Sequence, residues 1–254
     1  MDLPNLTIGQ FDLVYNVFSL TVATMFAAGI FFFTAKQLVS PKYRVGVIVS
    51  GVVVFVAGYH YFRIWESWFD AYTLTGGAYE PSGVPFNDAY RYADWLITVP
   101  LLLLELVAVL GLAKAISGPL LRNLTIASFV MIALGYPGEV AADAGSKWLW
   151  WALAIIPFIY ILYVLFTQLN KAIEGSSAEV SKLFARARSI IAISWLVYPI
   201  AFILPALGFL SGADGEVGLQ VGYAAADLIA KAFYGVVIYQ IARAKSDADG
   251  YEPA

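Results

Sequence analysis

Seven long runs of apolar residues, separated by short polar connections, dominate the pattern of the chain. The runs cover roughly 11–38, 44–72, 87–113, 119–141, 147–171, 186–210 and 217–243. Each run offers the ~20 residues that a helix needs to cross the hydrocarbon core of a bilayer. Because the connections are short, we expect neighbouring helices to pack antiparallel. The pattern predicts an all-α membrane protein of seven transmembrane helices that form a single domain over residues 1–254.

The longest connection covers residues 73–85 and reads TLTGGAYEPSGVP. Its glycines and prolines predict a turn or a small hairpin between the second and third helices. Residues 1–10 lack the basic stretch that begins a cleavable signal peptide, so we expect the first apolar run to direct insertion.

Basic residues gather at one end of the predicted bundle, which indicates its orientation. That end receives Lys36, Lys42, Arg44, Lys114, Arg122, Lys171, Lys182, Arg186, Arg188, Arg243 and Lys245, out of 15 basic residues in all. Cytoplasmic connections of membrane proteins carry an excess of Lys and Arg. We therefore expect the N-terminus and the hairpin outside the cell and the C-terminus in the cytoplasm.

The composition agrees with a membrane protein and excludes several kinds of site. Hydrophobic residues make up 61% of the chain and charged residues only 13%, which is unlike a soluble domain. Without cysteine, disulfides and thiolate metal sites are excluded, and a single histidine, His60, excludes a multi-histidine metal site. We expect the lipid bilayer as the main partner and no nucleic acid.

Lys231 lies near the middle of the last apolar run, one helical turn after Asp227. A lysine at membrane depth is costly and rare, and by default it marks a functional site. A charged Lys231 needs counter-charges, which Asp94 and Asp227 can supply while Arg91 balances the excess negative charge. The alternative is a purely structural ion pair with Asp227, and the pair alone leaves both interpretations open.

The third apolar run carries four polar residues, Arg91, Asp94, Thr98 and Glu105. Asp94 and Glu105 are nearly a whole number of helical turns apart, so both share one face, about 16 Å apart along the axis. Carboxyl groups on one face across a membrane suggest a proton path. Polar contacts between helices are the alternative, although such contacts usually favour Ser, Thr or Asn. Leucines surround Glu105 in the sequence, and desolvation there favours the protonated carboxyl group.

Segments of the third, sixth and seventh runs, RYADWLITVPLL, WLVYP and DLIAK, resemble the microbial rhodopsins. The segments AGYHYFRIWESW, FNDAYRYADWL, GYPGE and GLQVGYAAAD resemble most closely the xanthorhodopsin and Gloeobacter-rhodopsin branch, which is related to the proteorhodopsins. The resemblance extends over essentially all seven helices. It implies a light-driven outward proton pump of a prokaryotic cell membrane, not an enzyme with chemical turnover. It also implies all-trans retinal bound to Lys231 as a protonated Schiff base, and a homo-oligomer, either a pentamer or a trimer.

The resemblance further implies roles for the polar residues. Asp94 matches the primary proton acceptor, Asp227 the second counterion and Glu105 the cytoplasmic proton donor. Together with Thr98, the acceptor and the donor match the three-residue motif of the proton pumps. His60 matches a histidine that pairs with the acceptor in this branch. The alternative for a lone histidine is a core residue whose hydrogen bonds are satisfied.

Other residues match positions around the retinal. These are Trp95, Trp195, Tyr198, Tyr61, Met131, Pro199 and, beside the ionone ring, Gly135. Aromatic residues in membrane helices are otherwise most often packing residues or interface anchors, and a proline can simply kink a helix. Leu102 and Ala230 place apolar side chains near the Schiff base, so we expect absorption in the green rather than the blue. Trp151 stands where the branch carries a glycine that opens a window for a carotenoid antenna, so we expect no such antenna.

One departure from the haloarchaeal pumps concerns proton release. Their paired release glutamates are not found, because Leu219 occupies one of the expected positions and Glu216 lies outside the pattern. Early proton release is therefore not expected.

Three other functions remain as alternatives. A photosensory rhodopsin that signals to a partner often lacks a carboxylic donor, so Glu105 counts against it. Pumps of halide or sodium replace the residue at Asp94 or change the motif. An unrelated seven-helix transporter is the third, and bleaching by hydroxylamine would separate it from a retinal protein.

Overall fold

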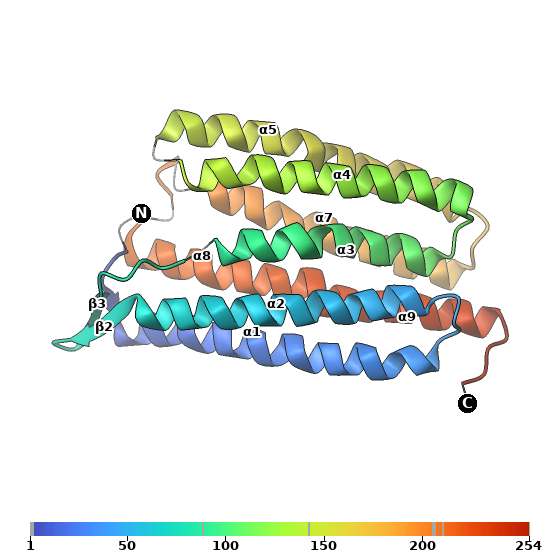
Figure 1. Ribbon diagram of the computed structural model, residues 1–254, viewed down its shortest axis with the longest axis horizontal. Coiled ribbons are helices and arrows are strands. Elements are labelled where there is room, and N and C mark those ends of the chain that lie inside the picture. The colour runs from blue at the N-terminus through green and yellow to red at the C-terminus, as the bar shows by residue number, and fades with distance from the viewer. Residues whose placement is uncertain (1–2, 88, 142, 205–206, 210, 254) are drawn as a thin grey trace.

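The computed structural model describes residues 3–87, 89–141, 143–204, 207–209 and 211–253. Within this part of the chain, seven helical spans are long and apolar enough to cross a membrane, and they lie side by side in one bundle (Figure 1). The spans are Ile8–Leu38, Arg44–Asp70, Tyr90–Leu110, Lys114–Glu139, Ala144–Ala172, Ala178–Ile203 and Gly212–Ala248. The predicted all-α fold with seven long apolar helices is therefore confirmed.

Several spans contain more than one helical element. The first consists of α1 (Ile8–Ala35) and η1 (Lys36–Leu38), and the next three are α2 (Arg44–Asp70), α3 (Tyr90–Leu110) and α4 (Lys114–Glu139). The fifth consists of α5 (Ala144–Tyr163), the π-helix η2 (Val164–Gln168) and α6 (Leu169–Ala172), and the sixth is α7 (Ala178–Ile203). The last joins α8 (Gly212–Asp227), the π-helix η4 (Leu228–Phe233) and α9 (Tyr234–Ala248). This last span packs against α1, α2 and α7, which closes the bundle.

The connection between α2 and α3 forms the predicted hairpin. Its strands are β2 (Tyr72–Thr75) and β3 (Ala78–Pro81), which pair antiparallel. Gly76 and Gly77 form the two-residue turn with φ of 61° and 93°, a left-handed conformation that glycine adopts without steric cost. A third strand, β1 (Leu6–Thr7), pairs with β3 and was not predicted, because two residues are too short to show an alternating pattern. The hairpin and the N-terminus lie at one end of the bundle and the C-terminus at the other (Figure 1).

The predicted start of the sixth helix, near residue 186, is wrong. The helix begins at Ala178, where the Ser177 hydroxyl accepts a hydrogen bond from the Val180 N–H at 3.3 Å. Its first turns are amphipathic: they bury Val180 and Phe184 but carry basic residues on the other side. A purely apolar run therefore does not indicate these turns, and residues predicted to form a connection belong to the helix. The predicted end, Leu210, lies outside the described residues.

Among the described residues, the buried acidic and basic side chains come from two spans. Arg91, Asp94 and Glu105 lie on α3, and Asp227 and Lys231 lie on the last span. Large apolar side chains cover much of the exposed surface of the helices instead. The charged groups are thus concentrated where α3 and the last span face the interior of the bundle, as expected of functional charges in a membrane protein.

Candidate functional site

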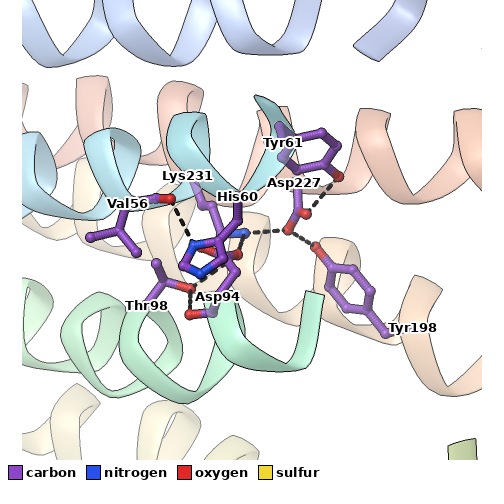
Figure 2. Close-up of polar contacts among 8 residues, drawn as sticks. All are labelled: Val56, His60, Tyr61, Asp94, Thr98, Tyr198, Asp227 and Lys231. Atoms are coloured by element: carbon purple, nitrogen blue, oxygen red, sulfur yellow. Dashed lines mark hydrogen bonds and ion pairs between the residues drawn. The ribbon is translucent and has the colours of Figure 1, made fainter. Parts of the chain in front are cut away.

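Lys231 is the centre of a buried ion cluster (Figure 2). Its Nζ donates hydrogen bonds to Asp94 Oδ2 at 2.5 Å and to Asp227 Oδ1 at 2.6 Å. The three side chains are 1–3% exposed. Two carboxylates beside one ammonium leave an excess negative charge, so the structure brings together the lysine and both of its predicted counter-charges.

The helix around Lys231 is wider than an α-helix. Residues Leu228–Phe233 form the π-helix η4, between Asp227 at the end of α8 and Tyr234 at the start of α9. Single π-helical turns inside α-helices are rare overall, and those that occur are often found at functional sites. The residue pattern does not indicate this π-helical turn, because the apolar run continues through it.

Asp227 is held by two tyrosines from different helices. Tyr61 on α2 donates to its Oδ2 at 2.7 Å, and Tyr198 on α7 donates to its Oδ1 at 2.6 Å (Figure 2). Counting Lys231, this carboxylate accepts three short hydrogen bonds, all of which stabilise its charged form. Tyr61, which was expected to line the retinal pocket, bonds to Asp227, and Asp227 lines the cavity described below.

Asp94 is less completely bonded than Asp227. Its Oδ2 accepts from Lys231 and, at 3.4 Å, faces the hydroxyl of Thr98, which lies closer to the Asp94 backbone oxygen, at 2.9 Å. Within the described residues its Oδ1 is buried without a hydrogen-bond partner. Of the two carboxylates beside Lys231, Asp94 is therefore the one with free capacity to take up a proton.

His60 approaches Asp94 but does not form a hydrogen bond with it. Its Nδ1 lies 3.9 Å from Asp94 Oδ1 and 2.9 Å from the Val56 backbone oxygen (Figure 2). Because a carbonyl oxygen only accepts, Nδ1 carries the hydrogen and donates it to Val56. At 3.9 Å the contact with Asp94 is electrostatic, longer than a hydrogen bond. The predicted pairing of His60 with Asp94 is therefore a long electrostatic contact and not a hydrogen bond.

An apolar cavity extends from Lys231 between α3, α4, α5 and α7. Of the residues that were predicted to surround a retinal, the cavity is lined by Trp95, Leu102, Met131, Gly135, Trp195, Tyr198, Pro199 and Ala230. It is also lined by residues that sequence reasoning missed, Tyr92, Val99, Ile132, Ala154, Ile155, Phe158, Phe202 and Tyr223. These are mostly apolar or aromatic residues at helical spacing, which look like ordinary core positions in a sequence.

Trp151 closes part of the cavity wall between two helices. It is half-buried on α5, lines the cavity, and its Nε1 donates to the backbone oxygen of Pro199 on α7 at 2.9 Å. A carbonyl oxygen has two lone pairs, so Pro199 can accept this bond in addition to a helical one, and the bond fixes the position of the indole.

Glu105 lies apart from the cluster on the same helix as Asp94. It is fully buried, and within the described residues neither carboxyl oxygen has a hydrogen-bond partner. An ionised carboxylate is strongly disfavoured in such surroundings. The group is therefore suited to hold a proton, as the leucine-rich sequence around it predicted.

Arg91 connects the cluster to the hairpin end of the bundle. Its Nη2 donates to Gln220 Oε1 at 2.5 Å, and its guanidinium lies 5.0 Å from the centre of the Tyr223 ring. Gln220 in turn donates from Nε2 to Glu216 Oε1 at 2.8 Å. Gln220 was not singled out in the sequence, since one amide in an apolar helix carries no distinctive pattern.

Comparisons with known proteins all find rhodopsins. A family model described as bacteriorhodopsin-like protein matches residues 13–245. The crystallographic structure of xanthorhodopsin, described as a light-driven ion pump with dual chromophore, is 52% identical with a TM-score of 0.95, covering 99% of this chain and 100% of that chain. A crystal structure of thermophilic rhodopsin is 50% identical with a TM-score of 0.94, covering 98% and 100%. The green-light absorbing proteorhodopsin of gamma-proteobacterium EBAC31A08 is 31% identical over 227 residues, 89% of this chain and 84% of that protein.

Proposed function

The chain belongs to the bacteriorhodopsin-like protein family, and we propose that it exports protons across a prokaryotic cell membrane when it absorbs light. It is a multi-pass membrane protein of the rhodopsin ion-pump family and not an enzyme. One observation carries the choice of the proton as the ion. Two buried carboxyl groups share one helix, with Asp94 in contact with Lys231 and Glu105 three turns further along.

The direction of transport rests on the orientation of the bundle. Basic residues gather at the end opposite the hairpin, and the positive-inside rule assigns that end to the cytoplasm. Asp94 then lies on the extracellular side of Glu105, because α3 begins near the hairpin. A proton that leaves Lys231 for Asp94 and is replaced from Glu105 has moved outward.

The cavity fits all-trans retinal attached to Lys231. Its walls are apolar and aromatic, its one lysine stands at the end, and two carboxylates can neutralise a positive charge on the lysine nitrogen. Bound there as a Schiff base, retinal would supply the absorption of light and a change of shape that alters proton affinity and access at that nitrogen.

The residues of the chain divide the proton transfers among them. Asp94 Oδ2, at 2.5 Å, takes the proton from the Lys231 nitrogen. Asp227 stays charged, because Tyr61 and Tyr198 stabilise its carboxylate. Glu105 returns a proton to the Lys231 nitrogen and is itself refilled from the cytoplasm. Asp94 then loses its proton to the outside, so each cycle exports one proton.

The alternatives are a photosensory rhodopsin and a pump of another ion. Ion replacement separates the pumps: vesicles that contain the protein are illuminated after sodium and chloride are exchanged for choline and sulfate. We expect unchanged light-driven proton movement. Loss of the signal with either exchange would assign the replaced ion instead, and the absence of any transport in a coloured protein would favour the sensor.

The resemblance to microbial rhodopsins also implies a homo-oligomer, and we expect a trimer or a pentamer. Cross-linking in membranes is the measurement.

Glu105→Gln should slow the return of the proton to Lys231 without preventing its loss. An amide at this buried position cannot release a proton, so reprotonation must wait for a slower route from the cytoplasm. We expect flash photolysis to show a late phase slowed by on the order of 10²-fold, and azide, a small proton carrier, to restore its rate. Wild-type kinetics in the variant would remove Glu105 from the path.

Trp151→Gly should open a route for a carotenoid to the retinal cavity. In the native chain the indole, held by Pro199, occupies the wall, so we expect an added hydroxylated carotenoid to transfer no energy. The fluorescence excitation spectrum of the retinal, recorded with that carotenoid, is the measurement. Carotenoid bands in the wild-type spectrum would contradict the proposal, whereas their appearance only in Trp151→Gly would support it. Leu149→Gly, on the exposed side of α5, is the control.

A further inference from the structure

A continuous polar chain leads from Arg91 to the hairpin end of the bundle. Arg91 and Gln220 are 1–2% exposed, and Gln220 accepts from the arginine while it donates to Glu216. Glu216 is half-buried, one helical turn before Gln220 on α8. The chain therefore joins a buried guanidinium on α3 to an acid that reaches the surface.

The two ends of the Gln220 amide have different partners, and only one orientation suits both. The guanidinium only donates, so it requires the amide oxygen. The Glu216 carboxylate only accepts, so it requires the amide NH2 group. By fixing the NH2 group, Glu216 keeps the oxygen turned toward Arg91. Without Glu216 the amide could rotate and turn its oxygen away from Arg91.

We propose that Glu216, acting through Gln220, positions Arg91 and thereby sets how readily Asp94 takes up a proton. The inference rests on the proposed function, since it concerns the residue that we assign as proton acceptor. It also gives Glu216 a role that differs from the paired release glutamates of haloarchaeal pumps, which this chain lacks at Leu219.

Asp94 responds to the position of Arg91 because few other charges surround it. From the last span it faces Lys231 and Asp227, and from α2 it faces His60 at 3.9 Å. Arg91 lies near the Phe18 ring on α1 and the Tyr223 ring on α8. It also interacts electrostatically with Tyr61 on α2 and with Glu139 on α4. Arg91 lies one helical turn before Asp94 on α3, so an arginine that is released from Gln220 can approach the carboxylates beside Lys231. Its approach disfavours protonation of Asp94.

The test is a pH titration of the visible spectrum of the retinal-bound protein, in which the acid red shift reports protonation of Asp94. We expect Glu216→Ala and Gln220→Leu to move the midpoint to lower pH by on the order of 1 pH unit. Glu216→Gln keeps an oxygen that accepts from Gln220, so its midpoint should stay within about 0.3 pH unit of wild type. Asp214→Asn is the control: it removes an acid from the same first turns of α8, but Asp214 bonds to Gln10 on α1, at 2.7 Å.

Three results would overturn the positioning role. The first is an unchanged midpoint in Glu216→Ala. The second is an equal shift in Asp214→Asn, and the third is a shift in Glu216→Gln as large as in Glu216→Ala. Either of the last two would mean that the removal of a surface charge alone moves the midpoint. Glu216 is half-buried, so Glu216→Ala tests the proposal even if Gln220→Leu fails to fold. The wild type separates this inference from the proposed function. If the wild type shows no colour with retinal or no light-driven acidification, the proposed function fails, whereas normal behaviour with unshifted variants rejects only the role of Glu216.

Discussion

Lys231→Ala yields a protein that stays colourless when retinal is supplied and moves no protons in light. Alanine has no amine to form a Schiff base, and the described cavity contains no second lysine. The substitution also leaves Asp94 and Asp227 buried without their ammonium partner, which costs about 3–5 kcal/mol of stability unless one of them takes a proton. The visible spectrum of the purified protein is the measurement.

A matched control separates loss of the chromophore from loss of the fold. Lys182→Ala removes an exposed lysine of α7 and should retain full colour. If Lys231→Ala is too unstable to purify, Lys231→Ala with Asp94→Asn removes one of the stranded carboxylates and should recover a folded, colourless protein. Normal visible absorption in either Lys231 variant would contradict the assignment of Lys231.

Asp94→Asn should absorb further to the red than the wild type and should not pump. An anion beside a positively charged chromophore stabilises its ground state, so neutralising that anion lowers the excitation energy. Asparagine also cannot accept the proton of Lys231, which abolishes transport. In the wild type, lowering the pH should produce the same red shift as Asp94 takes up a proton, and His60→Ala should move the midpoint of this transition, because His60 lies 3.9 Å away.

The pH titration of the Asp94→Asn spectrum decides this assignment. We expect it to lack the acid transition of the wild type. An unchanged transition would identify another carboxylate as the titrating group, and Asp227→Asn would be the variant to compare. Asp227 is the less suitable acceptor in this geometry, because two tyrosines already stabilise its charge.

The sequence predicted the cluster around Lys231 because charges inside apolar runs are conspicuous. Asp94, Asp227 and Lys231 stand out against leucine, valine and alanine. The helical repeat also places Asp227 and Lys231 on one face of the last helix. The structure adds the asymmetry between the carboxylates. Hydroxyls from two other helices bond to Asp227 and leave Asp94 with a free oxygen, and no pattern within one helix reveals such contacts.

Other features escaped prediction for identifiable reasons. The π-helix around Lys231 leaves the apolar pattern unchanged, and Gln220 is a single amide whose role depends on Arg91 and Glu216 across the bundle. The start of α7 escaped because its first turns carry a basic face that resembles a connection. Periodicity within a segment was thus informative, whereas contacts between segments required the structure.

The most direct test of outward proton pumping is the pH of a weakly buffered suspension of cells that contain the protein and retinal. We expect light to acidify the medium, a protonophore to abolish the change, and Lys231→Ala cells to show none. A light-induced pH change that persists, or that becomes an alkalinisation, when the protonophore is added would mean that protons move passively in response to another pumped ion. That result, or no light response from a coloured protein, would contradict the account.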